Sequence, residues 1–144
     1  MIAPRTAIRA VEIEFGDCDP AGIVFYPNYF RFFDAATAGL LFEALGVRKS
    51  DWLARFDVVG IPMVDTGAKF LRPSRLGDVV RIETTVTTIG RSSFQVAHRL
   101  YNAGELAVDA HEKRVWAGRA EDGSLRARTI PDEVRLALGH PAGG

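Results

Sequence analysis

One long helical pattern in an otherwise strand-like sequence most constrains the fold of this chain. From Asn28 to Leu45, apolar residues recur at spacings of three and four, which is typical of an α-helix. The residues that carry this period are Tyr29, Phe32, Phe33, Ala36, Leu40 and Ala44. Because Phe30, Leu41 and Phe42 widen the apolar surface, we expect other elements to cover this helix on several sides. Gly46 then ends it as a C-cap.

The segments around this helix show the alternation that is typical of β-strands. Before it, Val11, Ile13 and Phe15 alternate with charged residues in a predicted strand over residues 7–15. After it, we predict a short helical turn over 50–56, strands over 61–71, 79–89, 93–102, 106–117 and 125–130, and a terminal helix over 131–138. This order predicts an α+β fold in which one long helix lies across a curved antiparallel sheet of five or six strands.

Length and composition narrow the class of protein. With 144 residues we expect a single domain over 1–144, with frayed ends at about 1–6 and 139–144. Lys and Arg total 18, as do Asp and Glu, so no net charge favours nucleic acid or an anionic membrane as partner. No apolar run approaches the roughly 20 residues of a membrane span, and the first ten residues lack the apolar core of a secretory signal. Cys18 is the only cysteine, so no disulfide forms within the chain, and we expect a cytoplasmic protein.

The irregular segment Gly16–Gly22, between the first strand and the long helix, is the candidate for chemistry. It holds Asp17 and Asp19, which would face the same way in an extended chain. Unpaired backbone N–H groups near Phe25 and Tyr26, at the helix N-terminus, can stabilise an oxyanion. A nearby carboxylate can attack a carbonyl or activate water. The alternative is that both Asp residues only form the turn and cap the helix, and spacing alone leaves both interpretations open.

The stretch Phe-Gly-Asp-Cys-Asp-Pro-Ala-Gly-Ile-Val-Phe-Tyr-Pro-Asn-Tyr, residues 15–29, closely resembles the signature of the 4-hydroxybenzoyl-CoA thioesterase family, which has the hot-dog fold. Shorter matches extend the resemblance over nearly the whole chain: Phe32–Ala36, Gly77–Asp78, Arg91–Phe94 and Leu125–Arg126. The resemblance implies an acyl-CoA thioesterase that acts on an aromatic thioester such as 4-hydroxybenzoyl-CoA. It also implies that coenzyme A is part of the substrate and that no cofactor is needed.

The resemblance assigns roles to individual residues. Asp19, before Pro-Ala-Gly, matches the catalytic carboxylate, as nucleophile or general base. The backbone N–H of Tyr26 matches the oxyanion donor, and Gly22 would let the backbone pass close to the thioester. Phe25 and Phe33 are expected to line the acyl pocket. Asp34 matches a position associated with the ring substituent of the acyl group, although a plain helix-surface carboxylate is an equal alternative.

Arginine and serine residues are the candidates for binding CoA. Arg91, with Ser92 and Ser93, resembles the nucleotide-contacting turn of the family, although Ser92 stands where a basic residue is expected. Arg126 and Arg128 can add positive charge from the last strand, or belong to a solvated strand face. We expect no metal site, because the three histidines (His98, His111 and His140) are scattered, and we expect Cys18, between two carboxylates, to pack rather than react.

Two other functions fit the same fold. A hydratase or dehydratase acting on an acyl chain needs a histidine beside the helix, and none of the three is placed for it. A non-catalytic acyl-CoA binding protein would bind the thioester without turnover. The resemblance also implies a homo-oligomer, a tetramer built as a dimer of dimers, with active sites shared between chains. We expect the strands Val79–Ile89 and Ser93–Asn102 to offer uncovered edges for this pairing.

Overall fold

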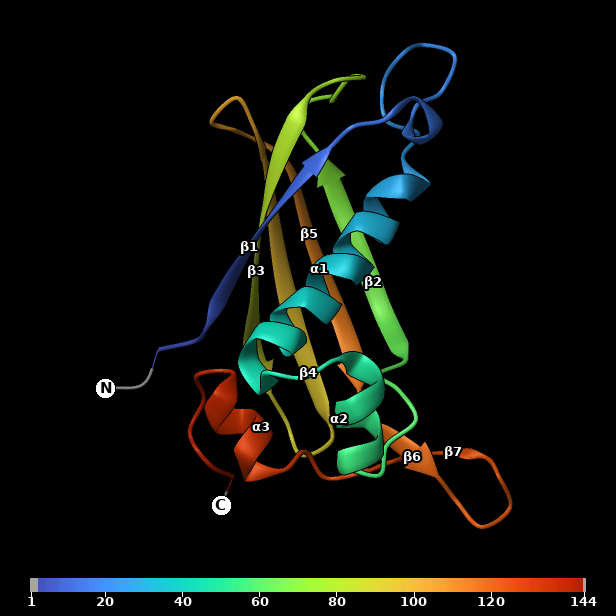
Figure 1. The fold of residues 1–144 in the computed structure, drawn as a ribbon, viewed down its shortest axis with the longest axis vertical. Helices are drawn as coiled ribbons and strands as arrows, with labels where there is room; N and C mark the ends of the chain where they lie inside the picture. Colours follow the sequence, from blue (N-terminus) through green and yellow to red (C-terminus); the bar gives the residue numbers. More distant parts are fainter. Residues whose placement is uncertain (1–2, 144) are drawn as a thin grey trace.

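One long helix lies across one face of a five-stranded antiparallel sheet in the computed structural model, which describes residues 3–143 (Figure 1). The strands β1 (Thr6–Glu12), β2 (Met63–Phe70), β3 (Val79–Ile89), β4 (Ser93–Asn102) and β5 (Glu105–Val115) lie in the order β1-β3-β4-β5-β2. A two-stranded ribbon joins β6 (Ala117–Arg119) to β7 (Leu125–Ala127). The helices are α1 (Pro27–Leu45), α2 (Lys49–Arg55) and α3 (Asp132–Ala137), with a 3-10 turn η1 (Phe15–Asp17). The predicted α+β hot-dog architecture is confirmed.

Both ends of α1 follow from local chemistry. Pro27 occupies its first turn, where the missing N–H of proline costs no helical hydrogen bond. Gly46 ends the helix in the left-handed conformation, with φ of 74°, and its N–H donates to Phe42 O at 2.8 Å. The helix predicted over 28–45 is therefore confirmed almost to the residue.

The core divides into two clusters along α1. The first lies beneath its N-terminal half and contains Phe33, Ile82 and Leu100. The second lies beneath its C-terminal half, where Trp52 of α2 stacks on Trp116 with ring centroids 5.3 Å apart. Because α2 and α3 close this end, α1 is covered by the sheet and by both short helices, as its broad apolar surface predicted.

The observed strands differ from the predicted ones where the chain departs locally from regular strand geometry. β1 ends at Glu12 and η1 follows, so Phe15 is 82% exposed instead of pointing inward as predicted. A register shift between Val86 and Thr88 likewise leaves Thr88 outside the buried face of β3. The predicted strand over 106–117 is interrupted at Trp116, whose N–H donates to Ser92 O at 2.7 Å. The last strand pairs with β6 rather than with the main sheet.

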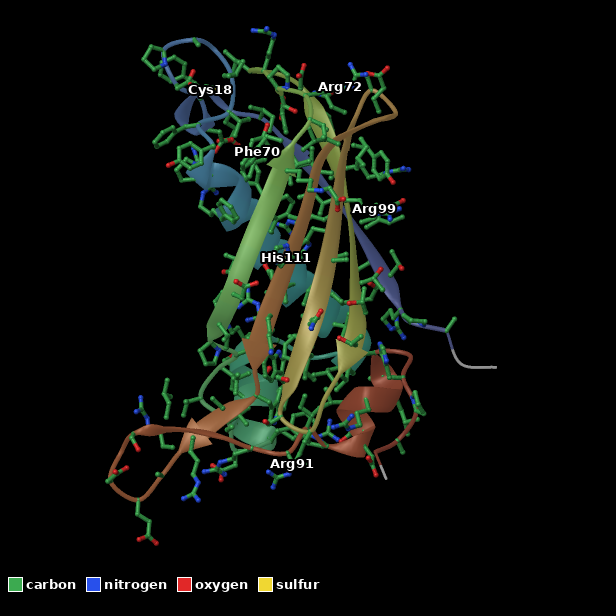
Figure 2. All side chains as sticks on the ribbon, turned by 180° about the vertical axis from the view of Figure 1, so that it is seen from behind. Cys18, Phe70, Arg72, Arg91, Arg99 and His111 are labelled. Atoms are coloured by element: carbon green, nitrogen blue, oxygen red, sulfur yellow. The ribbon has the colours of Figure 1, made fainter. Side chains whose placement is uncertain are left out.

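The free edges of the main sheet are β1 and β2, since β3 and β4 are each paired on both sides. The expectation that β3 and β4 offer edges to another subunit is therefore wrong. Exposed apolar side chains stand on both true edges, Ile8 on β1 and Val64 on β2. None of the helices formed by residues 3–143 covers the face of the sheet opposite α1 (Figure 2).

The described parts of both chain ends make hydrogen bonds. Arg5 N–H donates to Leu138 O at 2.9 Å, and Gly143 N–H donates to Asp132 Oδ1 at 2.9 Å. Expected fraying at Met1, Ile2 and Gly144 lies outside the described residues. None of the helices within residues 3–143 has the length and apolar character needed to cross a bilayer.

Candidate active site

The segment between η1 and α1 forms a narrow loop with Asp19 near its tip. Cys18 and Val24 make an isolated antiparallel bridge, and Asp19 N–H donates to Ile23 O at 2.9 Å. Below them, Phe25 N–H donates to Asp17 O at 2.9 Å. These bonds close the base of the loop and place Asp19 beyond it. Tyr26 and α1 follow directly after the base.

A tight turn orients Asp19. Its Oδ1 accepts the Ala21 N–H at 2.9 Å, and its carbonyl accepts the Gly22 N–H at 2.9 Å. Gly22 has a φ of 79°, a conformation that favours glycine, whereas an added Cβ would meet nothing within 4 Å. Within one chain, Gly22 is thus required by its backbone conformation and not by crowding. Asp19 lines a hollow of about 390 Å³ beside Phe15 and Leu76.

Asp17 does not share the environment of Asp19, contrary to the expectation that both face the same way. Asp17 is buried, and its Oδ1 lies 2.5 Å from Arg31 Nη2 on α1. Its Oδ2 accepts the Glu14 N–H at 2.9 Å, and its carbonyl accepts Asn28 Nδ2 at 2.9 Å. The two carboxylates separate because Asp17 ends a 3-10 turn rather than lying in an extended chain. Asp17 is therefore fully engaged, while no partner for Asp19 Oδ2 occurs within residues 3–143.

Tyr26 lies at the start of α1, before Pro27, which has no N–H to offer. No acceptor for the Tyr26 N–H lies within hydrogen-bonding distance among residues 3–143. The other expected donor, the Phe25 N–H, is taken by Asp17 O. Tyr26 is thus the donor that the helix N-terminus leaves available.

An apolar hollow of about 450 Å³ lies beside Tyr26, lined by Ile23, Val24, Tyr26, Tyr29, Phe70, Leu71, Arg72 and Pro73. Asp19 lines the separate hollow beside Phe15 and Leu76, so a single chain does not bring Asp19 and Tyr26 into the same cavity. Phe70, whose ring centroid lies 5.6 Å from that of Tyr29, was not among the residues predicted to form the site. Its position at the end of a strand and shortly before Pro73 was the available signal. Burial raises the pKa of Tyr29, against the effect of hydrogen bonding with Ser74.

The two phenylalanines expected in the acyl pocket have different positions. Phe33 is 1% exposed and stacks on His98 with centroids 4.8 Å apart, because it lies on the sheet-facing side of α1. It is a core residue and lines neither hollow, which corrects the expectation. Phe25 is 49% exposed and contacts Tyr26 edge to face, so it remains accessible.

Asp34 belongs to a chain of ionic contacts that the sequence pattern did not predict. Its Oδ1 lies 2.8 Å from Arg114 Nη2, and Arg114 Nε donates to buried Glu112 Oε1 at 2.8 Å. Glu112 Oε2 lies 3.2 Å from His98 Nε2. Burial raises the pKa of Glu112, but hydrogen bonds from His98 and Arg114 lower it more, to about 2. Asp34 is itself 64% exposed and so can still accept another donor.

His98 also bears on the hydratase alternative, because it lies beneath the central helix. It is 0% exposed, and its Nδ1 lies 2.8 Å from Thr84 Oγ1 while Glu112 engages the other ring nitrogen. A ring closed off in this way has no contact with a substrate. Within residues 3–143, no three His, Cys, Asp or Glu side chains are grouped so that they could hold a metal ion.

The residues expected to bind CoA lie at the end of the molecule opposite the Asp19 loop, as the labels of Cys18 and Arg91 show (Figure 2). Arg91 and Arg126 make no side-chain hydrogen bond within residues 3–143, and they line separate hollows. Arg128 is occupied, because it donates to Asp57 Oδ2 and to Arg119 O, both at 2.8 Å. One chain therefore keeps its candidate catalytic and CoA-binding residues apart.

Comparisons with known proteins agree with this architecture. A family model described as the thioesterase-like superfamily matches residues 13–138. The 4-hydroxybenzoyl-CoA thioesterase of Pseudomonas sp. (strain CBS-3) is 37% identical over 139 residues, which cover 92% of this chain and 97% of that one. A solved structure of an Asp-to-Asn variant of a 4-hydroxybenzoyl-CoA thioesterase, complexed with 4-hydroxybenzoyl-CoA, superposes with a TM-score of 0.84 at 34% identity, covering 93% and 99% of the two chains. A gentisyl-coenzyme A thioesterase gives 0.79 at 36% identity, covering 90% and 99%.

Proposed function

The chain belongs to the thioesterase-like superfamily and hydrolyses acyl-CoA thioesters, and we propose that its substrate is an aromatic acyl-CoA such as 4-hydroxybenzoyl-CoA. The observation that carries the proposal is the 37% identity to a 4-hydroxybenzoyl-CoA thioesterase over nearly the full length of both chains. The apolar hollow beside Tyr26 supports an aromatic acyl group, because its lining is almost entirely apolar and aromatic. The products are the free acid and CoA.

Asp19 is the catalytic carboxylate in this proposal. By one route it takes a proton from water, whose oxygen attacks the thioester carbonyl. By the other it attacks the carbonyl itself, and water then hydrolyses the resulting anhydride. In both routes a C–O bond forms, the C–S bond breaks, and CoA leaves as a thiolate that is protonated to the thiol. The unpaired Oδ2 of Asp19 and the occupied carboxylate of Asp17 support this choice of residue.

The Tyr26 N–H stabilises the oxyanion that forms on the carbonyl oxygen. Its position at the N-terminus of α1 adds the positive end of the helix dipole. Phe25 borders the acyl group, and Gly22 keeps the Asp19 turn in shape. Asp34, held by Arg114, accepts a hydrogen bond from a ring hydroxyl.

The active site is shared between chains of a homo-oligomer, a tetramer built as a dimer of dimers. Three features support this: Asp19 and Tyr26 line separate hollows, the CoA residues lie at the far end of the same chain, and both sheet edges carry exposed apolar side chains. Light scattering on the eluted protein should give about four times the 15.8 kDa chain mass. A monomer with full activity would contradict a shared site.

CoA is held through its phosphates by Arg91, with Ser92 and Ser93 in the same turn, and by Arg126. Each exposed charge-assisted contact is worth on the order of 1 kcal/mol. Arg128 contributes only if it leaves Asp57. The reaction needs no cofactor. A cytoplasmic location is supported by the single cysteine, which can form no disulfide within the chain.

The test is a thiol-release assay over 4-hydroxybenzoyl-, gentisyl-, phenylacetyl- and aliphatic CoA esters, with Asp19→Asn alongside the unaltered protein. We expect the hydroxylated aroyl esters to have the highest kcat/KM and Asp19→Asn to lose nearly all turnover. If esters bind but none is hydrolysed, the protein is instead an acyl-CoA binding protein. A single turnover in ¹⁸O-labelled water tests the nucleophilic route, because label in the Asp19 carboxylate shows that water hydrolysed an anhydride at its Asp19 carbonyl, whereas label in the product acid alone fits both routes.

A further inference from the structure

Arg135 on α3 is a charged residue that the proposed reaction does not use, yet its side chain is only 8% exposed. Its Nε donates to Ile130 O at 3.2 Å, and its Nη2 donates to Gly90 O at 2.5 Å and to Arg91 O at 3.3 Å. All three acceptors are backbone carbonyls, from two segments far apart in the sequence. A buried guanidinium is tolerated only when such bonds replace its water, so this geometry depends strictly on the position of the turn.

The carbonyls that Arg135 binds belong to the turn between β3 and β4. Gly90 N–H donates to Ser93 O at 2.7 Å across this turn, and Ile130 N–H donates to Arg91 O at 2.8 Å. The backbone of Gly90 and Arg91 is thereby tied inward, toward α3. The Arg91 side chain remains exposed, and its guanidinium makes no hydrogen bond among residues 3–143. Arg135 thus contacts the backbone from which the Arg91 side chain projects.

A hollow of about 610 Å³ lies between this turn and α3, with Arg91, Thr129, Asp132 and Arg135 in its lining. The Asp132 carboxylate is partly engaged, since its Oδ1 accepts the Gly143 N–H at 2.9 Å. The lining therefore combines two arginines with one aspartate and a threonine hydroxyl, and among residues 3–143 the Arg91 guanidinium has no hydrogen-bond partner. This balance of charge and donors suits a phosphate group.

We propose that Arg135 is a positioning residue for coenzyme A, which holds the Gly90–Arg91 turn so that Arg91 meets a phosphate group of the substrate in this hollow. The inference rests on the proposed function, because it takes CoA as the ligand of the turn. Arg135 acts through Arg91 and touches neither the thioester nor the acyl group.

The experiment compares an acyl-CoA with the N-acetylcysteamine thioester of the same acid, which has the reacting bond but no phosphate. In Arg135→Gln, kcat/KM for the acyl-CoA should fall about tenfold, mainly through KM, which corresponds to the loss of one charge-assisted contact. The N-acetylcysteamine ester should be hydrolysed at an unchanged rate. Arg91→Ala should show the same selective loss, and the double variant should lose little more, because both changes remove one interaction.

Arg135→Lys and Arg55→Gln are the matched comparisons. A lysine keeps the charge but cannot bridge the carbonyls of Gly90 and Ile130 together, so the selective loss should largely persist. Arg55, on α2, pairs with Glu133 of α3 and does not bind the turn. Arg55→Gln should therefore leave the hydrolysis of both esters unchanged.

Two results would overturn the proposal. Equal losses on both esters in Arg135→Gln would mean that Arg135 is needed only for general folding. An unchanged acyl-CoA KM would mean that the turn is placed without Arg135.

If the unaltered protein hydrolyses neither ester, the proposed function fails, and calorimetric titration with CoA tests the inference instead. Weaker CoA binding by Arg135→Gln than by the unaltered protein would support the inference. Unchanged or absent CoA binding would reject it.

Discussion

Arg31 Nη2 lies 2.5 Å from Asp17 Oδ1, so the central helix holds the first of the two loop carboxylates. The same Asp17 accepts the Glu14 N–H and, through its carbonyl, the Phe25 N–H. Asp17 thus joins the strand end, the loop and α1 at one point. The loop that carries Asp19 is anchored by a neighbour of the same residue type, and the two carboxylates have separate tasks.

Asp17→Asn should weaken this anchor. The ion pair and its hydrogen bonds are partly exposed, so we expect a loss of about 1–2 kcal/mol of folding free energy. That corresponds to a fall in Tm of several degrees for a domain of this size. Scanning fluorimetry and the thiol-release assay should show reduced stability with most of the activity kept. If Asp17→Asn instead abolished turnover in a fully stable protein, the assignment of catalysis to Asp19 would be wrong.

Tyr26→Pro should remove the oxyanion donor without removing the helix. The φ of Tyr26 is −52°, which proline can adopt, and proline has no N–H. We expect kcat to fall by about 10²- to 10³-fold, as for the loss of one oxyanion donor elsewhere. Tyr26→Ala is the control, because it removes the ring and keeps the N–H, and it should retain most of kcat. Equal activity of the two variants would exclude this N–H as the donor.

Gly22→Ala should strain the turn that orients Asp19. An alanine at a φ of 79° costs on the order of 1–2 kcal/mol, and relief of this strain should move the Asp19 carboxylate and lower kcat. Gly16→Ala is the matched control, since Gly16 is close to the same loop but has no positive φ and no neighbour within 4 Å of an added Cβ. Its kcat should be unchanged, and a loss as large as that of Gly22→Ala would argue against the conformational explanation.

Phe33→Ala and Phe25→Ala should separate packing from binding. Phe33 is 1% exposed in the core, so its truncation should cost about 3–5 kcal/mol of unfolding free energy. Phe25 is half exposed, and its truncation should leave stability within about 0.5 kcal/mol while raising KM for aroyl esters. Denaturant titration and steady-state kinetics measure the two effects. A stable Phe33→Ala protein with an altered ester preference would restore Phe33 to the acyl pocket.

Glu112 should make the free energy of unfolding fall at acidic pH. Its pKa in the folded protein is about 2, below the ordinary value of 4.5, so the unfolded chain binds the proton more tightly. The contribution of roughly 3 kcal/mol is fully present above about pH 4.5 and is lost as the pH falls toward 2. Urea unfolding at pH 7 and pH 3 measures this loss.

Glu112→Gln provides the comparison for that measurement. It leaves Arg114 buried with one charged partner fewer, so the protein should be less stable at pH 7 by about 3–5 kcal/mol. The fall in stability from pH 7 to pH 3 should be smaller than in the unaltered protein. An identical fall in both proteins would show that other carboxylates, such as Asp78, dominate the acid response.

Much of the fold was predictable because its signals are local. The period of α1, its proline start and its glycine end are all encoded within the helix and its flanks, and the structure confirms them. The alternation that predicted β3, β4 and β5 is similarly local. Two strand boundaries were wrong. At Phe15 a local 3-10 turn, closed by hydrogen bonds between Glu14 and Asp17, ends the strand pattern, and at Trp116 a hydrogen bond to the distant Ser92 interrupts it.

The sequence by itself determined the α+β class, the long helix and its ends, and the segment around Asp19 that carries the family signature. Only the tertiary structure decided that Asp17 pairs with Arg31, that Phe33 packs on His98, and that Arg135 holds the turn of Arg91. Helix periods and turns depend on residues that are close in the sequence, whereas the two residues of each of these pairs are 14 to 65 positions apart. Their contacts exist only after the sheet has closed over the helix, because only then do the distant side chains lose water together and satisfy one another.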